Sequence, residues 1–331
     1  ALGNYSLDAL TSGDYNVAMG HTALGANSTG GSNVAIGHES LLTNTTASNN
    51  TGVGFQSLKL NSTGDSNVAV GWHSLAANTT GYYNNAIGRD ALLANTEGAH
   101  NVSLGSDTLK LNTTGNSNVA VGGYSLEANT TASNNIAVGY TALRANTTGT
   151  RNIAIGSNAN DLADTENDNI AIGHDAMTAQ IAGASQNIAI GSYSLDALTT
   201  GDANVAIGHN AMTTNTSGEL NVAIGYQALE ASATAAGGVA IGSKALKVNT
   251  ADYNTAIGYL ALTANTTGTL NTAVGHAALD ANTTGSNNIA IGINALGVSV
   301  DVDNSVAIGF DAGAANLVAG IVAVGKDALK A

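Results

Sequence analysis

The chain contains no cysteine and no proline among its 331 residues. Without thiols it can form neither disulfide bonds nor thiolate metal sites. Charged residues make up only 10% of the sequence and aromatic residues only 4%, so the large side chains that fill a wide globular interior are scarce. We therefore predict a folded chain with a thin interior.

Basic residues are also scarce, because nine Lys and Arg stand against 23 Asp and Glu and give a net charge of -14. Binding to nucleic acid or to an anionic membrane relies on clustered basic residues. No apolar run approaches the ~20 residues needed to cross a bilayer, and no signal-like segment opens the chain. These absences predict that the segment binds no nucleic acid and does not insert into a membrane.

Glycine is abundant, and it marks a repeat. The Gly of Ala-Ile-Gly or Ala-Val-Gly recurs from Gly3 to Gly325, and sixteen of its nineteen spacings are 17 residues. A fixed period of this length is typical of solenoid proteins. We predict a single repetitive domain over 1–331, with irregular coils around 157–190 and 293–331.

Within each unit, Val-Ala-Ile places β-branched residues at alternate positions, which predicts a short strand. Leu or Met follows four residues after the Gly, and Asn-Thr-Thr-Gly then has the composition of a turn. Each strand should pair with the same strand one coil later, at ~4.8 Å. The predicted fold is an all-β, parallel β-solenoid of about 19–20 coils. The Ala-Leu segment is either a second short strand or one helical turn.

Stacked coils predict columns of identical side chains. We expect Val, Ile and Leu to point inward, with a core that includes Leu24, Leu75, Leu126 and Leu229. We expect the Asn four residues before the Gly to form a buried rank linked amide to amide; its members include Asn16, Asn33, Asn67, Asn118 and Asn221. The small residue at the strand centre predicts a close-packing face between copies, formed by Ala18, Ala35, Ala69, Ala86 and Ala120.

The strand motif Asn-Val-Ala-Ile-Gly, and Asn-Ser-Val-Ala-Ile-Gly at 304–309, resembles the head repeats of YadA-like trimeric autotransporter adhesins. This resemblance implies a left-handed parallel β-roll that assembles as a trimer and carries adhesion to a host or matrix surface. The 17-residue unit is longer than the head coil of that family. Its Asn-Thr-Thr-Gly extension is more similar to repeats of phage tail fibres and large bacterial surface proteins.

These features predict a structural or adhesive segment of an extracellular fibre or filament, at a cell or virion surface. Two alternatives are the shaft or receptor-binding region of a phage tail fibre, and an ice-binding solenoid that uses the Thr-Thr columns from Thr45 to Thr148. The expected partner is the chain itself, as a trimer or as an end-to-end filament. The chain starts inside a strand motif at Ala1 and stops six residues past Gly325, which predicts an excerpt of a longer repeat or coils that stack between subunits.

No paired carboxylates, nucleophile triad or phosphate loop can be singled out, which predicts no enzyme activity and no cofactor. Five histidines directly follow the repeat Gly: His21, His38, His174, His209 and His276. Aromatic residues fill the same slot in other coils, so we predict a solvent-facing slot for flat side chains and no metal. Its aromatic residues are predicted to contact a glycan or a partner: Trp72, Tyr140, Tyr226 and Tyr259.

Three further patterns have architectural explanations. Two acidic clusters, Asp164-Glu166-Asp168 and Asp301-Asp303, favour solubility over a calcium site. The turn asparagines match the N-glycosylation pattern, at Asn27, Asn44, Asn61, Asn78, Asn112, Asn129, Asn146, Asn215, Asn265 and Asn282. The stretch 157–190 loses the Asn and Thr ranks and holds an 18-residue coil, so we predict a loop or bulge there, near Ala163, Asp164, Gln180 and Ile181.

Overall fold

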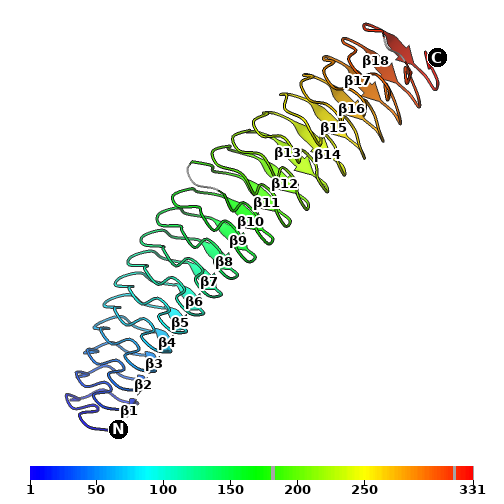
Figure 1. Ribbon diagram of the computed structural model, residues 1–331. Coiled ribbons are helices and arrows are strands. Elements are labelled where there is room, and N and C mark those ends of the chain that lie inside the picture. Colours follow the sequence, from blue (N-terminus) through cyan, green and yellow to red (C-terminus); the bar gives the residue numbers. More distant parts are fainter. Residues whose placement is uncertain (180–182, 316–317, 331) are drawn as a thin grey trace. The chain divides into compact units, whose positions relative to one another are not determined.

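The structure is a computed structural model that describes residues 1–179, 183–315 and 318–330. The chain divides into two compact units, Ala1–Asn167 and Asp168–Ala331. Each unit is a stack of coils that contribute one short strand apiece, as Figure 1 shows. All 19 strands are three residues long, and the described residues contain no α-helix. The predicted all-β parallel solenoid with a 17-residue repeat is confirmed.

In the first unit the strands are β1 (Val17–Met19), β2 (Val34–Ile36), β3 (Thr51–Val53), β4 (Val68–Val70), β5 (Asn85–Ile87), β6 (Val102–Leu104), β7 (Val119–Val121), β8 (Ile136–Val138) and β9 (Ile153–Ile155). In the second unit they are β10 (Ile170–Ile172), β11 (Ile188–Ile190), β12 (Val205–Ile207), β13 (Val222–Ile224), β14 (Val239–Ile241), β15 (Thr255–Ile257), β16 (Thr272–Val274), β17 (Ile289–Ile291), β18 (Val306–Ile308) and β19 (Val322–Val324). Consecutive strands within a unit pair in parallel and in register, so that Ala18 pairs with Ala35.

Positions within a coil are numbered here from the Gly that follows the strand, so the strand occupies -3 to -1 and the buried Leu is +4. The segment from +1 to +6 is a run of tight turns, neither a second strand nor a helical turn. Residues at +2, +4 and -5 adopt left-handed backbone angles, as at Thr22, Leu24 and Ser32, with φ of 56°, 52° and 58°. A left-handed residue costs about 1–2 kcal/mol, and burying a leucine contributes about 1.5–3 kcal/mol, so burial stabilises Leu at this corner.

The central residue of each strand points into the interior. The prediction that Val and Ile point inward is therefore wrong for the strands. Ala35 is fully buried, whereas Ile36 is 36% exposed and Val34 is half-buried. Alternate residues of a strand point to opposite faces, and the Leu at +4 of the opposite wall fills the interior. A Cβ built at Gly313, a +4 position, would lie 3.7 Å from the Cβ of Ala307 in the strand. The space opposite Leu therefore admits Ala and excludes Ile.

Two further predictions concern this interior. Leu24, Leu75, Leu126 and Leu229 are all fully buried, in the column at +4. The predicted close-packing face between copies is wrong, because its alanines line the inside of the coil and are 3% exposed or less, at Ala18, Ala35, Ala69, Ala86 and Ala120.

Two ranks of asparagine fill the rest of the interior. At -4, the backbone N–H of Asn33 donates to Oδ1 of Asn16 at 2.9 Å, and its Nδ2 donates to the carbonyl of Ala47 at 2.9 Å. At +7, Nδ2 of Asn44 donates to Oδ1 of Asn27 at 2.8 Å and to the same Ala47 carbonyl at 2.9 Å. The two ranks therefore donate to the same turn carbonyl. The +7 asparagines belong to the core as well as to the turn.

The predicted amide-to-amide contacts in the -4 rank occur beside these bonds. Nδ2 of Asn67 donates to Asn50 at 3.2 Å, and Nδ2 of Asn221 donates to Asn204 at 3.1 Å. Of the predicted members, Asn33, Asn67, Asn118 and Asn221 are buried, and Asn16 is half-buried.

The 18-residue coil keeps its strand register, since Ile170 pairs with Ile188 and the N–H of Asn187 donates to Asn169. The -4 rank therefore continues through this stretch. The +7 rank is interrupted at Ala163, and Asp164 follows it at an exposed position. Gln180 and Ile181, where the loop or bulge is predicted, lie outside the described residues. In the predicted irregular stretch 293–331, Val306 still pairs with Val322.

Candidate functional site

The outer face of the strands is the most uniform surface of both units. Positions -3 and -1 point outward, and position -1 is aliphatic in every one of the 19 strands. Position -3 is Val or Ile except at Thr51, Asn85, Thr255 and Thr272. None of these positions carries a charge, and Val17, Ile87 and Ile155 are 48%, 45% and 39% exposed. We call the -3 and -1 positions together the strand face.

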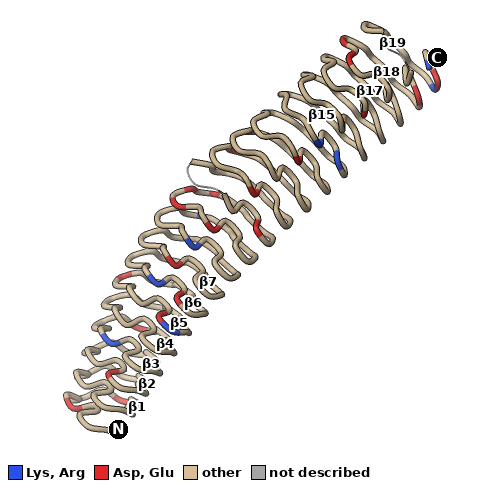
Figure 2. Tube along the Cα trace, in the orientation of Figure 1, with Lys and Arg blue, Asp and Glu red and all other residues tan. Residues whose placement is uncertain are grey.

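Charged residues gather elsewhere on the coils, as Figure 2 shows along the loops of both units. Ion pairs join position +2 to +5, as in Lys59–Glu39 at 2.7 Å, or two +5 positions, as in Lys247–Glu230 at 3.3 Å. The hydrogen bond from Lys59 lowers the pKa of Glu39. Burial would raise the pKa of Asp107, but hydrogen bonds from Lys110 and Ser106 outweigh it and lower that pKa. Charge on this side of the coil is thus largely paired.

In several coils the residue at +1, directly after the repeat Gly, carries a ring, and these rings form a column beside the strand face. In the first unit His21 stacks on His38 and His38 on Phe55, with ring centroids 5.2 Å apart in each pair, and Phe55 stacks on Trp72 at 6.4 Å. In the second unit His209 stacks on Tyr226 at 5.9 Å. The rings cover one another's faces in these runs and present their edges to solvent.

The four aromatic residues predicted from the sequence lie in this column. Trp72, Tyr140, Tyr226 and Tyr259 are 48%, 57%, 48% and 48% exposed. Tyr140 meets Tyr124 edge-on at 5.9 Å, and Tyr259 tilts against His276 at 5.4 Å. Their exposure leaves them available to a partner, although each of them lies next to another ring, which for Tyr140 is Tyr124 at +2.

Carboxylates of both acidic clusters accept hydrogen bonds from neighbouring turn residues. Oε2 of the buried Glu166 accepts the N–H groups of Asp164 and Thr165 at 2.7 and 2.9 Å. Oδ1 of Asp301 accepts the hydroxyls of Thr283 and Thr284 at 2.8 and 2.7 Å, which lowers the pKa of Asp301. Across the described ranges, no group of three or more His, Cys, Asp or Glu is placed to hold a metal ion.

The two Thr columns differ in what their hydroxyls do. At +8, the hydroxyl of Thr79 donates to the carbonyl of Thr96 at 3.0 Å, and that of Thr113 donates to Thr130 at 3.0 Å. At +9, Thr80, Thr114 and Thr131 are exposed. One Thr column is therefore tied to the backbone, and one faces solvent.

The glycosylation-like asparagines are sealed inside the coils. All ten are fully buried, and each Nδ2 donates to a carbonyl of its own turn, as Asn61 does to Gly64 at 2.9 Å. Glycosylation attaches at this nitrogen, which the folded coil keeps out of solvent. The sequence missed this burial because Asn-Thr-Thr-Gly has the composition of a surface turn.

No protein-family model matches the chain, and no curated protein matches its sequence. Within the described ranges, no helix is both long and apolar enough to cross a membrane.

Proposed function

We propose that this chain is a structural segment of an extracellular fibre, in which the strand faces of several copies pack against one another. The observation that carries the proposal is the strand face itself, aliphatic at -1 in every strand and uncharged throughout. Monomeric soluble proteins rarely expose large contiguous apolar patches. Regularly spaced rows of outward-facing Val and Ile, each half-buried or exposed, are therefore best explained as an assembly surface.

The occupant of this face is a second copy of the same chain. Copies with a net charge of -14 repel one another, so close contact requires a surface that carries no charge. The strand face meets this requirement, whereas positions +2 and +5 do not. Every copy offers the same rows at the same spacing, which suits a symmetric homo-oligomer. The resemblance to YadA-like head repeats favours three copies.

An extracellular location is part of the same proposal. The repeat supplies length and a regular surface, and the described ranges show no constellation of residues that would perform catalysis on a substrate. A rigid, repetitive segment without disulfides suits a fibre at a cell or virion surface.

The assembly proposal is tested by placing charge on the strand face. Ile257, Ile291 and Ile308 point outward and are 38%, 39% and 38% exposed, so replacing all three with lysine should leave the coils folded. Light scattering of the wild-type chain should give a multiple of 32.6 kDa, threefold for a trimer. The triple variant should give the monomer mass, because three buried unpaired charges per copy oppose association.

The matched control places three lysines on the exposed turn positions Thr200, Ser217 and Thr234. This variant should keep the wild-type mass. A wild-type monomer, or a strand-face variant that assembles as the wild type does, would contradict the proposal. Circular dichroism of both variants reports whether the fold persists.

We also propose that the exposed rings at +1 give the fibre an adhesive contact with glycans or with a host or matrix protein. Aromatic side chains with one exposed edge are common in recognition surfaces. Replacing Trp72 and Tyr140 with alanine should lower binding in a glycan array or to matrix-coated plates at least tenfold. Tyr82, 44% exposed but at +11, is the control, and its alanine variant should bind as the wild type does. Equal binding by all variants would exclude the ring column.

A further inference from the structure

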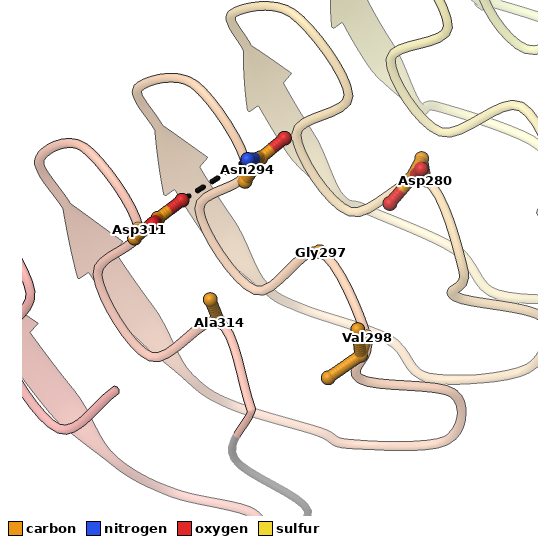
Figure 3. A pocket seen from close by; sticks show the side chains of 6 residues that line it. All are labelled: Asp280, Asn294, Gly297, Val298, Asp311 and Ala314. Carbon is orange, nitrogen blue, oxygen red and sulfur yellow. Dashed lines mark hydrogen bonds between the residues drawn. The ribbon is translucent and has the colours of Figure 1, made fainter. Parts of the chain in front are cut away.

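The second unit holds a hollow of about 230 Å³ on the side of the coil that elsewhere carries ion pairs. Its lining comes from three successive coils and comprises Asp280, Asn294, Gly297, Val298, Asp311 and Ala314. Figure 3 shows Gly297 between Asp280 and Ala314, with Asp311 beside Asn294. The hollow exists because Gly297 and Ala314 occupy +5, where other coils carry long side chains such as Lys59 and Lys110.

Several acidic residues of this side meet a cation, and Asp280 is one that does not. Glu39, Asp107 and Asp161 each meet a Lys or Arg within 3.0 Å. No ion pair involves Asp280 within the described ranges, and burial raises its pKa. Asp311 is already satisfied, because Lys330 and Asn294 donate to it at 2.6 and 3.0 Å. The hollow therefore contains one carboxylate that has no ion-pair partner within the described ranges.

We propose that this hollow binds a primary alkylammonium group, with the ammonium at the Asp280 carboxylate and the alkyl stem against Val298 and Ala314. A Cβ built at Gly297 would lie 3.4 Å from Oδ1 of Asp280, so a group entering over Gly297 reaches the carboxylate directly. The ammonium would supply the partner that lysines at +5 supply elsewhere. Val298 is 54% exposed and offers an apolar wall for methylene groups.

The test measures binding of 1,4-diaminobutane and of Nα-acetyl-lysine methylamide to the full chain by equilibrium dialysis, in about 150 mM salt to screen the acidic surface. Saturable binding of one molecule per chain is expected for at least one probe. Binding of the diamine alone identifies a free amine as the ligand, and binding of the lysine analogue identifies a protein side chain. Methylammonium, which lacks a stem, should bind at least tenfold more weakly.

Two variants and one control locate the site. Asp280→Asn removes the charge and should weaken binding at least tenfold. Gly297→Lys should abolish binding and raise the melting temperature, because the new ammonium occupies the hollow. Gly25→Lys is the control, since Gly25 also lies at +5 but is followed one coil later by Leu42, and it should bind as the wild type does. No saturable binding, or equal binding by wild type and Asp280→Asn, overturns the proposal.

Discussion

Replacing Gly122 with alanine is expected to lower the melting temperature by about 10 °C, whereas the same change at the adjacent Gly123 should alter it by less than about 2 °C. Gly122 has φ of 116°, and a Cβ there would lie 2.6 Å from the carbonyl oxygen of Gly139 in the next coil. At Gly123 the nearest atom to an added Cβ is 3.7 Å away. The alanine at 122 must therefore strain the backbone and separate two stacked coils.

Thermal unfolding followed by circular dichroism measures both variants. Hydrogen exchange should show that the loss of protection in Gly122→Ala is centred on β7 and β8, because each coil contacts only its neighbours. Equal melting temperatures for the two variants would show that the Gly column does not set the coil spacing.

Replacing Asn160 with leucine is expected to stabilise the chain by on the order of 3 kcal/mol. Asn160 occupies the +4 column of buried leucines and is itself fully buried. Neither its Nδ2 nor its Oδ1 has a hydrogen-bond partner within the described ranges. Leucine removes two unsatisfied polar atoms and restores the apolar contacts that Leu143 makes one coil earlier.

The control for this variant is Asn134→Leu, at an exposed -5 position. Asn160 and Asn134 have similar backbone angles, with φ of 51° and 63°, so both changes carry the same left-handed cost for leucine. Only Asn160→Leu should raise the midpoint of urea unfolding. A midpoint that falls or stays unchanged for Asn160→Leu would mean that the buried amide is satisfied in solution.

The repeat predicted the strands, their register and the buried leucines, but it did not predict which face of the strand is inside. Alternation in Val34-Ala35-Ile36 defines two faces without assigning either to the core. The inner face is decided by the space inside the coil, because Leu41 on the opposite wall leaves room only for a side chain as small as that of Ala35. For this reason the sequence alone did not single out the strand face.

The +7 asparagines show a second limit of composition. Asn44-Thr45-Thr46 has the residues of an exposed turn, yet only Asn44 is buried. A usable signal was present in the repeat, because +7 stays Asn over eight successive coils while +5 changes from Gly25 to Leu42 to Lys59. In this pair of positions, the one that stays constant is the interior one. The exposed ring slot was anticipated because its residues vary.

The side chains at +7 and +10 occupy the same space inside the coil, so the residue at one position limits the residue at the other. A Cβ at Gly149 would lie 2.4 Å from Oδ1 of Asn146, so a large residue does not fit beside Asn. Where +7 is Ala163, position +10 accepts Glu166, and where +7 is Ser299 it accepts Val302. Single-position propensities do not report such paired substitutions.

The rank of buried amides at +7 has a direction. From Asn44 to Asn146, each Nδ2 donates to the Oδ1 one coil earlier, as Asn61 does to Asn44 at 3.0 Å and Asn146 to Asn129 at 3.1 Å. The side-chain dipoles therefore add head to tail along the stack, as peptide dipoles do in a helix. The run ends at Oδ1 of Asn146, which has no partner within the described ranges because Ala163 follows it. Partial negative charge thus accumulates at that end of the first unit, and each added asparagine polarises those before it.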